Sequence, residues 1–245
     1  MQGNLYMENV LETTKRAWES QQQQFDVLRE QMVRAIREKH SIYLFGCSHA
    51  GILAEEMFYR TGGLALINPI FFPGFMLNTR PITMTSQLER IEGIGKTLLL
   101  QNHVKAGDFL LIHSVSGRNT VPVEMAIEAR KMGVFVACIT NLEYSKSVSS
   151  RHPSGKHLFE VSDVVIDNCG VVGDAAIKMD GLEEKVGPTS TAVGTAILNA
   201  LVVDVIEELV NAGEVPPIFM SANLDGGDEH NRKMMEEYKD NIFYM

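Results

Sequence analysis

Residues 109–140 read FLLIHSVSGRNTVPVEMAIEARKMGVFVACIT, and this stretch decides the fold. Its first five residues, Phe109–His113, form an apolar run that is typical of a strand buried on both faces. A polar loop follows, and then a helical pattern over Thr120–Met132 that ends at Gly133. A second apolar run, Val134–Ile139, comes next. The stretch therefore predicts a β-α-β unit, in which two parallel strands are joined by a right-handed crossover.

The same alternation of strands and helices extends to both sides of this unit. Upstream, the pattern predicts strands at Ile42–Phe45 and Leu64–Ile70, with a helix over His49–Arg60 between them. Downstream, it predicts a strand at Asp163–Asp167 and a long helix over Thr189–Asn211. Strands that alternate with helices in this way predict an α/β protein with a doubly wound, five-stranded parallel sheet of the flavodoxin type.

Sheets of this type bind their ligands at the carboxyl ends of the strands. We therefore expect function in the loops after Phe45, His113 and Ile139. The other expected elements are loops at residues 69–81 and 145–154, short helices at 84–90 and 95–103, a Gly-rich irregular stretch at 168–188, and a last helix at 228–241.

The first 40 residues are expected to form a helical arm, and residues 41–245 the domain that follows it. Leu11, Trp18, Phe25 and Met32 lie seven residues apart, which predicts one long helix or two stacked helices with an apolar stripe. Two interpretations fit this stripe. The arm either packs on the core of its own domain or forms a contact between subunits.

Composition limits the classes of function. The chain is 45% hydrophobic, which suits a packed core, and its net charge of −9 without a dense Lys/Arg run argues against nucleic acid as a partner. No signal-peptide pattern opens the sequence, and no window approaches the roughly 20 apolar residues of a membrane span, so no membrane association is expected. Three cysteines without zinc-type spacing indicate a reducing compartment, the cytoplasm, and no metal or cofactor is expected.

Two polar loops join a buried strand to a helix. Residues 46–51 read GCSHAG, in which small residues allow a tight turn and the helix start offers free N–H groups beside Ser48 and His49. A plain turn would explain this loop alone. Residues 114–120 read SVSGRNT, and an N-cap would explain only one or two of these polar residues. The whole cluster indicates a phosphate cradle, with ligand contacts from Ser114, Ser116, Gly117, Arg118, Asn119 and Thr120.

Two further polar clusters precede helices. Thr189, Ser190 and Thr191 are a third candidate group of ligand contacts, and one of them is expected to be the N-cap of its helix. The stretch DGGDEHN at residues 225–231 contains His230. This histidine is either a surface residue of a capped helix start or a proton-transfer group, since the usual histidine pKa lies near neutral pH.

With two Ser-rich loops after strands, and S-x-S-G in the second, residues 41–211 resemble the SIS (sugar isomerase) domain family, in a branch similar to phosphoheptose isomerases. The resemblance implies a flavodoxin-like sheet, a phosphorylated sugar as ligand, no required metal, and homodimers or tetramers with sites near subunit contacts. It also implies that Ser114 and Ser116 are phosphate-loop serines. Asn119 stands where the family commonly has threonine.

The first loop departs from the G-x-G-x-S pattern of that family. Gly46 matches the first glycine, but Ser48 replaces the second glycine and Ala50 replaces the serine. Either Ser48 takes over the ligand contact from a shifted position, or this contact is lost.

Three classes of function remain after the motifs are weighed. The first is an aldose–ketose sugar-phosphate isomerase, which needs a base near carbon 2 of the sugar. We predict Glu56 for this role, because it shares a helical face with His49, and His230 as its partner in proton transfer. Residues 183 and 184, both glutamates, are alternatives for the base.

The second class is a sugar-phosphate sensor without turnover, and a phosphosugar lyase would fit the same fold. A serine hydrolase is the third, because residues 46–51 resemble a nucleophile elbow and Asp225 and His230 follow in the order of α/β-hydrolases. That fold needs strands before the nucleophile strand, and here only a helical segment precedes it. The hydrolase is therefore the weakest of the three.

Overall fold

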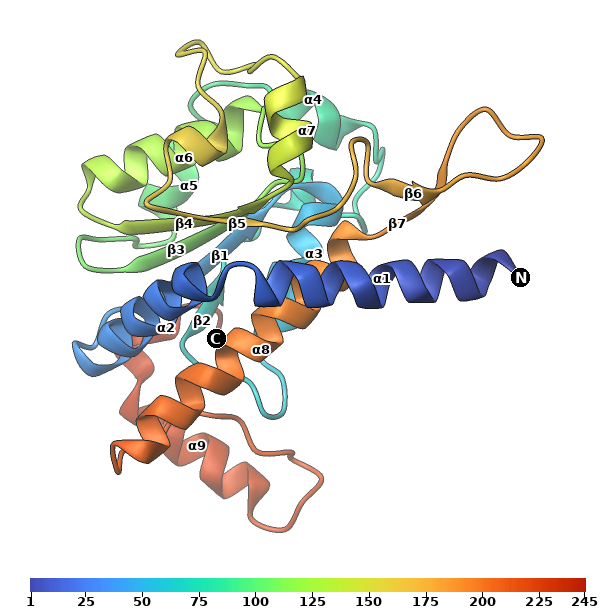
Figure 1. The fold of residues 1–245 in the computed structure, drawn as a ribbon. Helices are drawn as coiled ribbons and strands as arrows, with labels where there is room; N and C mark the ends of the chain where they lie inside the picture. Colours follow the sequence, from blue (N-terminus) through green and yellow to red (C-terminus); the bar gives the residue numbers. More distant parts are fainter.

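A computed structural model describes residues 1–245, the whole chain. Its centre is a sheet of five parallel strands in the order β2-β1-β3-β4-β5 (Figure 1). This order confirms the predicted α/β class and the doubly wound sheet. The strands are β1 (Ile42–Gly46), β2 (Ile67–Pro69), β3 (Phe109–His113), β4 (Phe135–Thr140) and β5 (Val164–Asp167).

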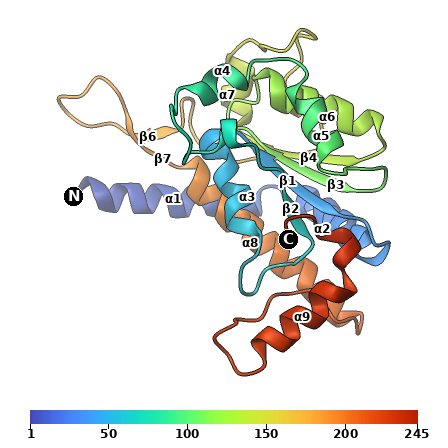
Figure 2. The same cartoon turned by 180° about the vertical axis from the view of Figure 1, so that it is seen from behind.

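Helices cover both faces of the sheet (Figures 1 and 2). Successive side chains of β3 alternate between two apolar cores: Phe109 and Leu111 belong to one, and Leu110 and Ile112 to the other. Such burial on both faces explains why the strands are continuous apolar runs. One core is closed by α2 (Gln22–Arg37), α3 (Ile52–Met57) and α8 (Ser190–Asn211), and the other by α5 (Ile94–Gln101) and α6 (Thr120–Lys131).

The N-terminal arm is two helices, α1 (Gln2–Glu19) and α2. Phe25 and Met32 of α2 are buried in the domain core. Leu5 and Leu11 of α1 are 48% and 64% exposed. The half of the stripe on α2 therefore packs on its own domain, as does Trp18 near the end of α1, whose ring centroid lies 4.4 Å from that of Phe25. Only the first part of α1, with Leu5 and Leu11, leaves its apolar side chains exposed.

The break between α1 and α2 places Gln21 against the open edge of the sheet. The side-chain amide of Gln21 donates from Nε2 to the Asp167 carbonyl at 2.8 Å, and its Oε1 accepts from the Asp167 N–H at 2.7 Å. These two bonds replace those of a neighbouring strand, so the edge strand β5 is covered by a side chain.

The helix after β1 differs from the prediction of one helix over residues 49–60. It begins as a 3-10 turn at Ser48–Gly51, continues as α3, and ends at Met57. The predicted end at Arg60 was wrong, because Tyr59 already has a left-handed backbone with φ of 44°.

Two segments expected to be irregular contain regular structure. The stretch after β4 includes α7 (Leu142–Ser147), which Asn141 caps by accepting the Tyr144 N–H at 2.7 Å. The Gly-rich stretch includes the hairpin β6 (Ala175–Ile177) and β7 (Val186–Pro188), which projects from the domain beside α1 (Figures 1 and 2). The Tyr6 hydroxyl donates to the Pro188 carbonyl at 2.8 Å and ties the two projections together.

The C-terminal segment closes the other edge of the sheet. Asn68 on β2 donates from Nδ2 to the Asn241 carbonyl at 2.8 Å and accepts the Phe243 N–H at 2.7 Å. Helix α9 (Gly227–Glu237) lies at the end of the molecule away from α4 (Met84–Leu88) and α7 (Figures 1 and 2). None of the helices combines the length and hydropathy that crossing a bilayer requires.

Candidate functional site

The loops after β1 and β3 leave the sheet side by side. Gly46 and His113, the last residues of the two strands, are paired in register. From here the chain turns outward in opposite directions, from β1 to β2 and from β3 to β4. This is the topological switch point of the sheet, where open α/β proteins bind their ligands.

The β3–α6 loop presents unpaired hydrogen-bond donors. The loop carbonyls of Val115 and Gly117 are bound by the N–H groups of Asn141 and Leu158, at 2.9 and 2.8 Å. Five backbone N–H groups of the loop have no acceptor within the chain: those of Val115, Ser116, Arg118, Asn119 and Thr120. Such a run of free N–H groups, on a loop that opens a helix of three turns, favours an anion.

The two serines of this loop and Gly117 extend the donor set. Ser114 and Ser116 are half-buried, and their hydroxyls make no hydrogen bond within the chain. Gly117 has φ of 57°, and a Cβ there would lie 3.0 Å from the Ser145 hydroxyl oxygen. The loop therefore needs glycine at this position to keep its backbone conformation.

The β1 loop keeps its tight turn although serine replaces a glycine in it. Ser48 has the left-handed φ of 57° that glycine adopts most easily, so the backbone follows the glycine path at a strain of about 1 kcal/mol. A Cβ on Gly46 would lie 2.4 Å from the Ala50 carbonyl oxygen, so this position requires glycine. His113 Nδ1 bonds the same carbonyl at 3.0 Å, and burial lowers the pKa of His113 to about 4. A neutral imidazole thus ties the β1 loop to the end of β3.

A crevice beside Ser48 brings in a residue that the sequence analysis missed. Its lining includes Ser48, Glu55 and the aromatic side chains of Phe71, Phe72 and Phe75. Glu55 is exposed on α3 and makes no ion pair. The carboxylate that shares a crevice with the β1 loop is therefore Glu55.

The neighbouring Glu56, predicted as the base, has other contacts. It pairs with Arg60 and accepts a hydrogen bond from Asn199 Nδ2 on α8 at 3.3 Å. The prediction assumed one continuous α-helix from His49. The first turn is instead a 3-10 turn, and of the two glutamates it is Glu55 that lines the crevice with Ser48.

The sequence of this chain matches the model of the SIS domain family over residues 5–141. It is also 59% identical to a UPF0309 protein of Shouchella clausii over 214 residues, 87% of each chain, and 51% identical to a UPF0309 protein of Oceanobacillus iheyensis over 240 residues, 98% of each chain. The chain belongs to the SIS domain family. This membership confirms the resemblance inferred from the two loops.

Solved structures show the same SIS fold at low sequence identity. A phosphoheptose isomerase from Francisella tularensis superposes with a TM-score of 0.54 at 12% identity, covering 84% of this chain and 97% of that one. The NanR protein of Vibrio vulnificus complexed with ManNAc-6P superposes with a TM-score of 0.52 at 15% identity, covering 98% of this chain and 69% of that one. These neighbours show that the chain shares their fold.

Within the SIS domain, the start of α8 is already occupied by a carboxylate. Asp174 Oδ1 accepts the N–H groups of Thr189 and Ser190 at 3.1 and 2.9 Å, and Asp174 Oδ2 accepts the Ser190 hydroxyl at 2.7 Å. Thr189 is the N-cap of α8, as predicted, but its side chain makes no capping hydrogen bond, because Asp174 accepts the N–H groups at the helix start instead. Thr191 is half-buried, and the Thr189 hydroxyl is buried without a partner.

Other predicted residues of this SIS domain lie away from the switch point. His230 is on α9, at the far end of the molecule (Figures 1 and 2), with Nε2 3.0 Å from the Ile218 carbonyl oxygen. Residues 183 and 184 are exposed on the β6–β7 hairpin. His49 is exposed on the β1 loop itself. The structure therefore brings together the β1 loop, the β3–α6 loop and Glu55, and it does not bring His230 to them within one chain.

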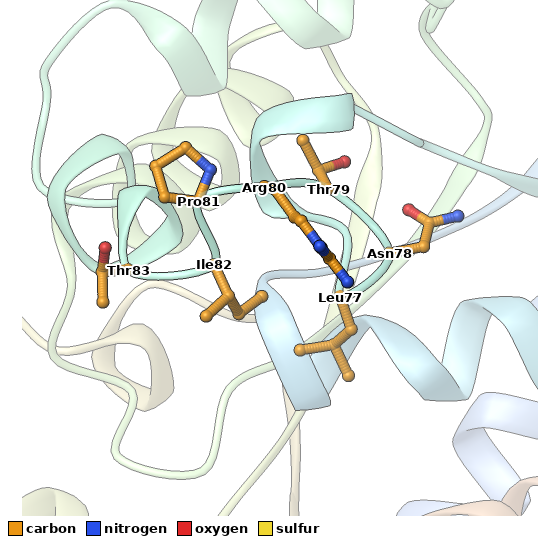
Figure 3. Close-up of a pocket in the computed structure, with 7 residues that line it drawn as sticks. All are labelled: Leu77, Asn78, Thr79, Arg80, Pro81, Ile82 and Thr83. Carbon is orange, nitrogen blue, oxygen red and sulfur yellow. The ribbon is translucent and has the colours of Figure 1, made fainter.

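A second hollow of this SIS domain lies on the surface turn before α4. Figure 3 shows its lining, the single segment Leu77–Thr83, which includes Arg80. None of the residues of the two polar loops lines it, so we do not assign it to the site. No group of three or more His, Cys, Asp and Glu side chains is arranged to hold a metal ion.

Proposed function

We propose that this SIS domain protein binds a phosphorylated sugar at the switch point, with the phosphate on the loop of residues 114–120. The observation that carries the proposal is the array of free N–H groups with the unpaired hydroxyls of Ser114 and Ser116. An array of this kind binds a phosphate without any fixed cation. We place the sugar next to the β1 loop, at the mouth of the narrow crevice lined by Ser48 and Phe72.

We further propose that the protein is an aldose–ketose isomerase of the cytoplasm. Isomerisation moves a proton between adjacent carbons through an enediol, so it needs one carboxylate base at the sugar and no redox partner. Glu55 is the carboxylate that lines the crevice with Ser48. His230 of a second subunit is our candidate for ring opening, because its own subunit holds it away from the site.

A sensor without turnover is the second candidate function. It is favoured by one specific observation, the match over 98% of this chain to NanR, a protein solved in complex with ManNAc-6P. A phosphosugar lyase on the same fold is a third candidate. The chemical identity of the product would distinguish a lyase from an isomerase.

A thermal-shift screen tests the proposed binding. We expect one or more sugar phosphates to raise the melting temperature, while the unphosphorylated sugars leave it unchanged. A ligand at 100 times its Kd adds about 2.7 kcal/mol to the free energy of unfolding, a shift that is readily measured. If a sugar and its phosphate shifted the melting temperature equally, or if no sugar phosphate shifted it, the loop of residues 114–120 would not be a phosphate site.

We also propose that α1 forms a contact between subunits. Leu5 and Leu11 are 48% and 64% exposed on a helix that projects past the sheet (Figure 1). Replacing both by lysine is expected to lower the molar mass in analytical ultracentrifugation to that of a monomer, because charges would be buried in the contact. Phe25, which is only 3% exposed, is unsuited to this test, since a charge there would unfold the core.

The matched control for the arm is Val215→Lys. Val215 is 84% exposed on the turn after α8, so its replacement should change neither stability nor assembly. An oligomer that survives the double substitution in α1 would show that the arm is not the contact.

A further inference from the structure

The loop after α7 fastens Arg151 onto the start of α6. The Arg151 N–H donates to the Arg118 carbonyl at 2.8 Å, and its Nη1 donates to Asn119 Oδ1 at 2.7 Å. The Arg151 carbonyl accepts the Thr120 hydroxyl at 3.1 Å. Contacts to three consecutive residues hold this arginine beside the phosphate loop, although it is distant in sequence.

These contacts also change the roles expected of Asn119 and Thr120. The Asn119 side chain is buried between Arg151 and the side chain of Glu89 on the segment after α4, and the Thr120 hydroxyl is bound to the backbone. Both side chains therefore make hydrogen bonds within the chain, and only the backbone N–H groups of these two residues are free to bind a ligand. Asn119, which stands where the family commonly has threonine, therefore orients the side chain of Arg151.

Arg118 brings a second guanidinium to the same place. Its Nη2 donates to the Ser149 hydroxyl oxygen at 3.2 Å, but its Nε is buried and has no acceptor within the chain. A buried donor without a partner, on a charged group, destabilises the protein unless an acceptor reaches it. The buried Nε therefore indicates that an acceptor from outside the chain belongs here.

Charge is unbalanced around this arginine pair. The carboxyl of Glu89 faces it, and burial raises the pKa of Glu89. The pKa of Arg151 is lowered, first by its partial burial and then by the nearby charges of Arg118 and Arg90. Three arginines face one carboxyl, in a chain of net charge −9, at a helix start that already favours anions. The excess positive charge at this position favours the binding of an anion.

We propose that Arg118 and Arg151 form a cationic wall of the phosphate site, and that the site thereby selects ligands with a doubly charged phosphate ester. This inference rests on the proposed function. The N–H groups and the serine hydroxyls recognise the shape of a tetrahedral oxyanion, and they do so for one or two charges alike. The two guanidinium groups add the preference for the dianion. Sulfate esters, which have the same shape and one charge, are rejected.

The experiment uses methyl phosphate and methyl sulfate as probes, at pH 7.5 and several ionic strengths, with Kd values from NMR titration. We expect the protein to bind methyl phosphate about 10-fold more tightly than methyl sulfate at low salt. Replacing Arg118 and Arg151 together by methionine removes most of this preference and most of the salt dependence. The R151K variant keeps the charge and should retain both. A merely structural role in holding Asn119 would move neither the preference for the dianion nor the salt dependence.

The matched control is Arg130→Met at the other end of α6, where Arg130 pairs with Asp163 at 2.9 Å. It should bind both probes as the parent does. If the double methionine variant folds and keeps the preference and salt dependence, the cationic wall is refuted and the phosphate loop stands. If the parent protein does not bind methyl phosphate, or if alanine at Ser114 and Ser116 leaves the affinity unchanged, the proposed function itself fails.

Discussion

Replacing Ser114 and Ser116 together by alanine will weaken the binding of a sugar phosphate about 10-fold or more. Each hydroxyl is half-buried, makes no bond within the chain, and stands on a loop whose N–H groups are also free. A hydrogen bond to a charged group contributes roughly 1.5–3 kcal/mol, so the loss of even one accounts for a 10-fold change. Isothermal titration with the sugar phosphate that gives the largest thermal shift measures the effect.

The control for this substitution removes two serine hydroxyls elsewhere. Ser20 and Ser147 donate only to carbonyls of their own helices, at 2.7 and 2.8 Å, and both are exposed. Alanine at these two positions should leave the affinity unchanged. Because the serines of the phosphate loop make no internal bond, their loss should also spare the melting temperature. An affinity equal to that of the parent protein would mean that the loop is only the N-terminus of α6.

Glu55→Gln will lower the rate of sugar-phosphate isomerisation by about 10²–10⁴-fold, the usual contribution of a general base. The amide keeps the size and the hydrogen-bonding capacity of the carboxylate but does not accept a proton at neutral pH. Glu55 is exposed and makes no ion pair, so the substitution should leave folding and ligand affinity nearly unchanged. NMR of the aldose and ketose phosphates at equilibrium and during turnover measures the rate.

Glu56→Gln is the matched control, one residue along the same helix. It removes a surface ion pair with Arg60, a contact of about 0–1 kcal/mol, and should leave the rate within a few-fold of the parent. If Glu56→Gln abolishes turnover and Glu55→Gln does not, the base is Glu56 and our reading of the crevice is wrong. If the parent protein binds a sugar phosphate without converting it, the sensor function replaces the isomerase.

The strands of the sheet were predictable because each is a short apolar run between turns. For β3 the predicted and observed bounds agree, and for β1 and β5 they differ by one residue. A strand buried on both faces has a local signature that needs no knowledge of its neighbours. The alternation with helices then determined parallel pairing and the position of the loops, so the loop of residues 114–120 was located at the end of β3 from sequence alone.

The details of the site depended on geometry that the pattern does not contain. The base predicted at Glu56 is paired with Arg60, and it is the adjacent Glu55 that lines the crevice with Ser48. The serine cluster before α8 looked like a free helix start, but the chain folds Asp174 onto it. Neither outcome changes the hydrophobic pattern, and so neither was visible in it.

For this SIS domain protein, the sequence by itself determined the layers, the strand order implied by the crossovers and the edge of the sheet where ligands bind, because these follow from short-range patterns of burial. Only the tertiary structure decided which polar side chains meet. Gln21 reaches the edge strand at Asp167, and Arg151 reaches the phosphate loop at Asn119. Contacts of this kind join residues 146 and 32 positions apart, and the free energy that forms them comes from packing of the whole domain rather than from either segment.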